Sequence, residues 1–191
     1  RVSFQVAMSR LGGTTIDLNP NTSQIGRGEL IKDTARVMSR YCDALAIRSF
    51  NQNDLKEYTS WASIPVINAL TDLEHPCQAL ADFLTIKEEF GNFEKLILTF
   101  IGDGNNVANS LILCGLILGI EIRIACPKGY EPDKTILNKA NEIDPDNKII
   151  ITDDPYKAAS NANILYTDVW SSMGEEDEKI NKDKKFVGFS I

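Results

Sequence analysis

The chain has 191 residues, of which 43% are hydrophobic and 25% are charged, a composition typical of soluble globular proteins. Its net charge of −7 argues against a basic face for nucleic acid, and its longest apolar run, near residues 110–120, is too short to span a bilayer. We therefore expect no nucleic-acid partner and no membrane partner.

The chain contains four cysteines and one histidine, which limits its metal and redox chemistry. No two cysteines form a C-x-x-C pair, so neither a zinc site nor a disulfide framework is indicated. The cysteines are Cys42, Cys77, Cys114 and Cys126. Because no charged-then-apolar leader opens the chain either, we expect a reducing, cytoplasmic setting.

Helices and strands are predicted to alternate along the chain, from the spacing of apolar residues. The first series is a helix over 1–11, a short strand over 14–19, a helix over 29–42, a strand over 43–50, a helix over 53–62, a strand over 65–70 and a long helix over 75–91. The second series has strands over 95–103, 121–127, 148–154 and 163–170, and helices over 105–119, 133–143 and 155–162. The charged run 174–185 is predicted to be a solvated loop, and residues 184–191 to open a further strand.

This alternation predicts the α/β class, with two doubly wound parallel-sheet domains joined by a long interdomain helix. We place the domains at 1–90 and 91–191, with the helix over 75–91 between them. The chain begins with Arg1 inside a predicted helix and ends where a strand is predicted to begin. We therefore expect it to be a piece of a longer protein, truncated at both ends.

Polar residues follow several predicted strands, at the edge where open parallel sheets bind ligands. Arg48 ends one strand and Asp168 ends the last. A guanidinium at a strand tip suits a phosphate or carbonyl oxygen, although a surface arginine paired with an acid is an equal alternative. A carboxylate suits an ammonium group, although aspartate at a strand end is more often a turn former.

The segment EHPCQALADF contains the one histidine, directly before a predicted helix. If Pro76 is the first helical residue, Gln78 returns to the side of His75. An imidazole and an amide near a helix N-terminus suit a carbonyl oxygen that gains charge during acyl transfer. Taken alone, a single histidine is more often a residue without a chemical role.

The segment FIGDGNNVANS partly matches a dinucleotide-binding motif. Gly102 and Gly104 occupy the first two glycine positions, but Val107 occupies the third. A nicotinamide oxidoreductase is therefore a weak alternative. A tight turn that presents Asn105 and Asn106 to a small polar ligand is preferred.

Together these segments resemble the aspartate/ornithine carbamoyltransferase family, on its ornithine-using side. HPCQALAD is similar to the H-P-x-Q signature, and DVWSSMG to the D-x-x-x-S-M-G loop. RVSFQVAM resembles the continuation of a Ser-Thr-Arg-Thr-Arg phosphate motif, of which Arg1 is the last residue. Further blocks are similar in the same order: QIGRGELIKDTARVMSRYCDALAIRSF, VINALTDLEHPCQALAD and FIGDGNNVANS.

The resemblance implies transfer of the carbamoyl group of carbamoyl phosphate to the δ-amine of L-ornithine, giving L-citrulline and phosphate. It also implies a homotrimer that uses no metal and no cofactor. Arg48 and His75 would be catalytic, and would bind carbamoyl phosphate together with Gln78 and, from a neighbouring subunit, Gln24. The residues that would bind ornithine are Leu70, Asn106, Asp168, Ser172 and Met173.

The chain departs from the family pattern at its ends. The Ser-Thr-Arg-Thr segment is absent before Arg1, and a later H-C-L-P motif is absent after Ile191. We therefore expect this chain by itself to be inactive or nearly so. Putrescine or another amine or amino acid stays open as the second substrate, and so does a non-catalytic, ligand-binding role for this piece.

Overall fold

The computed structural model describes residues 2–19, 23–146, 149–170 and 179–191. The chain divides into two compact units, which are described separately: unit 1 is Arg1–Leu45 with Lys56–Val66, and unit 2 is Ala46–Leu55 with Ile67–Ile191. The domain boundary near residue 90 stays a prediction.

Unit 1 is mostly helical. Its helices are α1 (Val2–Arg10), the short 3-10 helix η2 (Ile25–Arg27), α2 (Ile31–Met38) and most of α3 (Gln52–Trp61). The guanidinium of Arg36 lies 4.4 Å from the centre of the Trp61 ring, which joins α2 to α3. The predicted strand over 14–19 is wrong: these residues have no regular structure, and Ile16 is 70% exposed, as expected where no neighbouring strand pairs with them.

Two strands continue from unit 1 into unit 2. β1 (Leu45–Arg48) and β2 (Val66–Leu70) are hydrogen-bonded neighbours in a two-stranded sheet. Beyond this pair, the backbone N–H of Ser49 donates to the carbonyl of Leu70 over 3.0 Å. The tips of β1 and β2, where Arg48 and Leu70 lie, are therefore adjacent within unit 2.

Unit 2 contains a four-stranded parallel sheet in the order β5-β4-β3-β6. The central strand β3 (Ile97–Ile101) is nearly all buried, as expected for a strand covered on both faces. Its neighbours are β4 (Glu121–Ala125) and β6 (Ile164–Tyr166), and β5 (Ile149–Thr152) pairs with β4. The predicted α/β class with parallel strands is confirmed.

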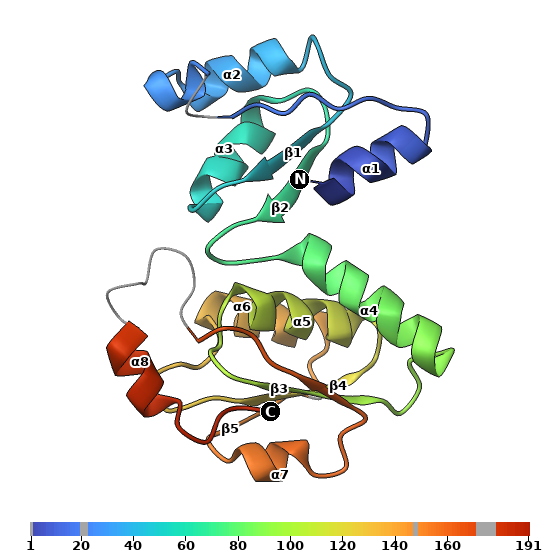
Figure 1. The fold of residues 1–191 in the computed structure, drawn as a ribbon, viewed down its shortest axis with the longest axis vertical. Coiled ribbons are helices and arrows are strands. Elements are labelled where there is room, and N and C mark those ends of the chain that lie inside the picture. Colours follow the sequence, from blue (N-terminus) through green and yellow to red (C-terminus); the bar gives the residue numbers. More distant parts are fainter. Residues whose placement is uncertain (1, 20–22, 147–148, 171–178) are drawn as a thin grey trace. The chain divides into compact units, whose positions relative to one another are not determined.

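Helices cover both faces of this sheet, as Figure 1 shows. α4 (Pro76–Phe90), α5 (Asn106–Ile117) and α6 (Lys134–Ile143) lie on one face, and α7 (Pro155–Ala159) lies on the other. The predicted interdomain helix is not seen as such, because α4 lies wholly in unit 2. Its buried residues, Ala79, Phe83 and Ile86, belong to the same core as β3 and α5.

The core of unit 2 forms where α5 packs onto the sheet. Leu98 and Phe100 from β3, and Leu111 and Ile112 from α5, are fully buried. Gly115 allows this close approach, since a Cβ atom there would lie 2.4 Å from Cδ1 of Ile122. Among the described residues, no helix is both long and apolar enough to cross a membrane.

The end of the chain differs from the prediction. The run 174–185 was expected to be a solvated loop, but its described end forms helix α8 (Lys179–Lys185), in which Lys182 is 2% exposed. The predicted strand over 184–191 is also wrong. Phe186 and Phe189 instead belong to a buried apolar cluster against which Trp170 packs, and this burial favours the observed arrangement.

Candidate active site

His75 lies at the end of the β2–α4 turn, directly before the first residue of α4. Pro76 takes the first helical position, where its missing N–H costs nothing. The backbone N–H of His75 donates to Oγ of Ser110 on α5 over 2.7 Å. The histidine is therefore held on a rigid frame rather than on a free loop.

The turn before His75 is closed by its own hydrogen bonds. Thr71 is fully buried, and its N–H donates to the carbonyl of Glu74 over 2.8 Å, while the Glu74 N–H donates to Thr71 Oγ1 over 3.1 Å. Thr71 Oγ1 also donates to Oε1 of Gln52 over 2.6 Å, and Nε2 of Gln52 donates to Glu74 over 3.1 Å. These contacts fix the backbone that leads to the imidazole.

The surroundings of His75 lower its pKa below the ordinary value of 6.5. Burial is the largest cause and the positive charge of Arg48 the next, while the carboxylates of Asp168 and Asp82 oppose them. Arg48 and Asp168 therefore act on the charge of the imidazole in opposite directions. Nδ1 of His75 is buried and, among the described residues, has no hydrogen-bond partner.

A lowered pKa makes a testable prediction about His75. As the one histidine of the chain, it should give a single imidazole Cε1–H resonance, whose titration midpoint should lie below 6.5. Since the folded state favours the neutral ring, this group stabilises the fold fully above pH 6.5 and loses that effect as the pH falls through the lowered pKa. Arg48→Gln should raise the midpoint and Asp168→Asn should lower it further, whereas unchanged midpoints in both variants would contradict this arrangement.

Gln78 lies in the first turn of α4 and is hydrogen-bonded to an acid of the same helix. Its Nε2 donates to Oδ1 of Asp82 over 2.9 Å. The other carboxylate oxygen of Asp82 accepts from the hydroxyl of Tyr166 on β6 over 2.9 Å. Burial and this carboxylate both raise the pKa of Tyr166, so the phenol stays protonated and donates.

The turn between β3 and α5 presents two asparagines. Asn105 caps α5 by accepting from the N–H groups of Val107 and Ala108, and its Nδ2 donates to Oδ2 of Asp168 over 3.2 Å. Asn106 donates to the carbonyl of Thr71 over 2.7 Å. Asn106 is therefore bonded to the same turn that leads to His75, and Asp168 is bonded to its neighbour.

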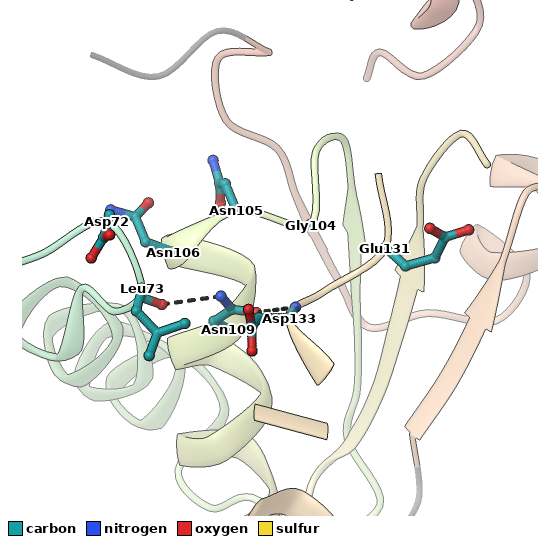
Figure 2. A pocket seen from close by; sticks show the side chains of 8 residues that line it. All are labelled: Asp72, Leu73, Gly104, Asn105, Asn106, Asn109, Glu131 and Asp133. Atoms are coloured by element: carbon teal, nitrogen blue, oxygen red, sulfur yellow. Dashed lines mark hydrogen bonds between the residues drawn. The ribbon is translucent and has the colours of Figure 1, made fainter. Parts of the chain in front are cut away.

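A small polar hollow of about 290 Å³ lies beside this turn (Figure 2). Within it, Asn109 donates to the carbonyl of Leu73 over 3.0 Å and accepts from the N–H of Asp133 over 3.2 Å. Of the predicted site residues that the structure describes, Asn106 is the one that lines it. The lining residues are Asp72, Leu73, Gly104, Asn105, Asn106, Asn109, Glu131 and Asp133.

Gly104 brings this turn against another loop of unit 2. A Cβ atom at this position would lie 2.4 Å from the backbone nitrogen of Pro132 and 2.6 Å from the carbonyl oxygen of Tyr130. The N–H of Gly104 donates to that same carbonyl over 2.9 Å. Position 104 therefore requires a residue without a side chain.

Asp103, on the same turn, forms a buried ion pair with α8. Nζ of Lys182 lies 2.6 Å from Oδ2 of Asp103, and the two side chains are only 3% and 12% exposed. The ammonium also lies 5.6 Å from the centre of the Tyr130 ring, which packs edge-on against Phe186. Helix α8 is thus bound to the β3–α5 turn through this ion pair.

The remaining predicted residues are placed as follows. Leu70 ends β2 and is partly buried beside the tip of β1. Gln24 is exposed and lies in unit 1, directly before η2. Ser172 and Met173 lie outside the described residues.

Several residues of the site were not anticipated from the sequence. Asp82 could have been found, since it follows Gln78 at the spacing that places two side chains on one face of a helix. Ser110 and Tyr166 gave no local signal, because their partners are 35 and 84 residues away in the chain. No group of three or more His, Cys, Asp or Glu side chains within the described ranges is arranged to hold a metal ion.

Comparison with known families supplies the context for this geometry. One family model, described as the carbamoyl-P binding domain of aspartate/ornithine carbamoyltransferase, matches residues 1–88. A second, described as the Asp/Orn binding domain of the same proteins, matches residues 94–191. The chain belongs to the aspartate/ornithine carbamoyltransferase family. The family that the sequence motifs resemble is thereby confirmed.

Individual members of the aspartate/ornithine carbamoyltransferase family are similar over the whole chain. The ornithine carbamoyltransferase of Prochlorococcus marinus (strain MIT 9312) is 72% identical over 192 residues, which are 100% of this chain and 62% of that relative. The solved ornithine carbamoyltransferase of Pyrococcus furiosus is 44% identical with a TM-score of 0.93, and the match covers 100% of this chain and 62% of that one. The anabolic enzyme of Campylobacter jejuni is 39% identical with a TM-score of 0.93, over 100% of this chain and 64% of the other. This chain therefore spans less than two thirds of the length of these relatives.

Proposed function

We propose that the protein containing this chain is an ornithine carbamoyltransferase, which converts carbamoyl phosphate and L-ornithine into L-citrulline and phosphate. The observation that carries the proposal is that Asn105 and Asn106, on one turn, are hydrogen-bonded to Asp168 and to the turn that leads to His75. Arg48 and Asp168, which come from different parts of the chain, shift the pKa of His75 in opposite directions. Family membership supplies the reaction class.

The proposed mechanism begins with carbamoyl phosphate. Arg48 and His75 bind its carbonyl oxygen and stabilise the negative charge that this oxygen gains. A lowered pKa keeps the imidazole neutral near pH 7, so His75 acts as a hydrogen-bond donor rather than as a charged group. Gln78 holds the carbamoyl group, and Gln24 of a neighbouring subunit binds the phosphate.

Ornithine is then bound by its amino-acid head group. Asp168 pairs with the α-ammonium, Asn106 contributes a side-chain amide, and Leu70, Ser172 and Met173 complete the pocket. The δ-amine, once deprotonated, attacks the carbonyl carbon, and the tetrahedral intermediate collapses with release of phosphate. Rate acceleration comes from positioning and charge stabilisation, without a covalent intermediate on the enzyme.

We further propose that residues 1–90 bind carbamoyl phosphate and residues 91–191 bind ornithine. The two family models support this division, since the first ends at 88 and the second begins at 94. A cytoplasmic homotrimer is the assembly implied by the resemblance.

The test is a substrate comparison on the full-length protein. Citrulline or carbamoyl product is measured with ornithine, putrescine and aspartate at equal concentrations of carbamoyl phosphate. We expect kcat/KM for ornithine to exceed that for putrescine about a hundredfold or more. Putrescine lacks the α-carboxylate of ornithine, and a site built to bind a polar group rejects an analogue without that group.

Asp168→Asn tests the proposed contact of Asp168 with the ammonium group. It should lower kcat/KM for ornithine and for putrescine alike, because putrescine keeps the ammonium group and lacks only the α-carboxylate of ornithine. Equal use of both amines by the unaltered protein would favour the putrescine alternative. An absence of carbamoyl transfer to any amine would reject the proposed function.

A further inference from the structure

The contacts of Asp82 carry an inference beyond the proposed function, on which it rests. Asp82 lies on α4, is half-buried, and uses both of its carboxylate oxygens. Oδ1 accepts from Nε2 of Gln78 and Oδ2 accepts from the hydroxyl of Tyr166, each over 2.9 Å. The acid therefore joins a residue proposed to hold the carbamoyl group to the strand that leads to Asp168.

The carboxylate of Asp82 fixes the orientation of the Gln78 amide, with Nε2 toward Asp82. An ionised carboxylate can only accept hydrogen bonds, so it binds the NH₂ end of an amide and not the carbonyl end. The hydroxyl of Tyr166 holds the carboxylate in place from the sheet, so Asp82 cannot follow a rotating glutamine. With Nε2 bound, Oε1 of Gln78 is the end left to face a ligand, and it can only accept.

A fixed acceptor at Gln78 would distinguish carbamoyl phosphate from acetyl phosphate, two compounds of nearly the same size. Carbamoyl phosphate carries an NH₂ group beside its carbonyl, and acetyl phosphate carries a methyl group there. A fixed acceptor at Gln78 binds the NH₂ group and gains nothing from the methyl group. An acceptor that the bound ligand covers also costs free energy when the ligand cannot donate to it.

We propose that Asp82 is a specificity-determining, positioning residue: by fixing the Gln78 amide with its oxygen toward the ligand, it selects a carbamoyl group over an acetyl group. Tyr166 supports Asp82 from β6. Asp82 itself does not touch the substrate in this scheme.

The test measures discrimination rather than activity alone. In the full-length protein, the KM for carbamoyl phosphate is compared with the inhibition constant of acetyl phosphate, a competitive analogue. Asp82→Leu removes the acceptor at similar volume, and the ratio of inhibition constant to KM should fall roughly five- to tenfold, the size of one hydrogen bond. The KM for ornithine should change less than the KM for carbamoyl phosphate.

Two further variants separate orientation from structure. Asp82→Asn keeps one acceptor oxygen for Gln78 and should restore most of the discrimination. Glu89→Leu makes the same kind of change at an exposed position of α4 and should leave the ratio unchanged. Asp82→Ser, whose shorter side chain cannot reach Gln78, replaces Asp82→Leu if the leucine variant does not fold.

An unchanged ratio in Asp82→Leu or Asp82→Ser, with both ligands weakened equally, would overturn this inference and leave the proposed function intact. Failure of the unaltered protein to transfer carbamoyl groups would instead reject the proposed function.

Discussion

Replacing His75 with alanine should lower kcat for carbamoyl transfer by about a hundredfold or more in the full-length protein. Its imidazole is proposed to donate to the carbonyl oxygen as that oxygen gains charge, and removal of one such donor has an effect of about this size. The pocket around it should survive, because the contact that holds the residue is made by its backbone N–H to Ser110, which alanine retains.

The measurement is steady-state kinetics with both substrates, accompanied by urea unfolding. Glu89→Ala, at an exposed position of the same helix, is the control for general damage to α4 and should keep the full rate. A normal rate in His75→Ala would remove the imidazole from the mechanism. A large loss of stability would show that His75 has a structural role instead.

Replacing Lys182 with methionine should lower the free energy of unfolding by about 3 kcal/mol. Its ammonium compensates the carboxylate of Asp103 at 2.6 Å, with the two side chains only 3% and 12% exposed. Removing one member of a buried ion pair leaves the other charge in a poorly solvated place, and costs about 3–5 kcal/mol in well-studied cases. Methionine keeps all but one atom of the side-chain length, so the loss reports mainly on charge rather than on packing.

Two variants test this interpretation of Lys182. Lys128→Met breaks a pair with Asp153 whose side chains are 85% and 54% exposed, and should cost less than about 1 kcal/mol. The double variant Lys182→Met, Asp103→Leu should recover much of the lost stability, because neither charge is then buried. Unfolding is followed by the fluorescence of Trp170, which packs on Phe186, in a Trp61→Phe background. Equal costs for the buried and the exposed pair would contradict the prediction.

The regular elements of the fold could be predicted because their patterns are local. The apolar run of β3 and the polar caps of α5 and α6 can be identified within a few residues of sequence. The segment 14–19 has the composition of a strand, but a strand needs a neighbour, and composition does not show whether one is available. The charged run that ends in α8 was misjudged for a related reason, since the partner of Lys182 is 79 residues away.

The same distinction applies to the candidate site. The rule that ligands bind at strand tips pointed to Arg48 and Asp168, and both residues shift the pKa of His75 in the folded chain. No pattern in the sequence indicated that Asn105 would bind Asp168, or that Tyr166 would hold Asp82, since these partners come from distant segments. Candidate residues could thus be predicted from single segments, whereas the bonds that orient them depend on the folded sheet.

The tight fit at Gly104 limits which residues of the β3–α5 turn can be varied. A library that randomises the β3–α5 turn should yield folded members only where position 104 remains glycine, since even alanine would collide with the backbone of the loop at Tyr130 and Pro132. Diversity is better placed at exposed residues that line the hollow, such as Asp72 and Glu131. Substitutions are therefore expected to be tolerated beside Gly104 but not at Gly104 itself.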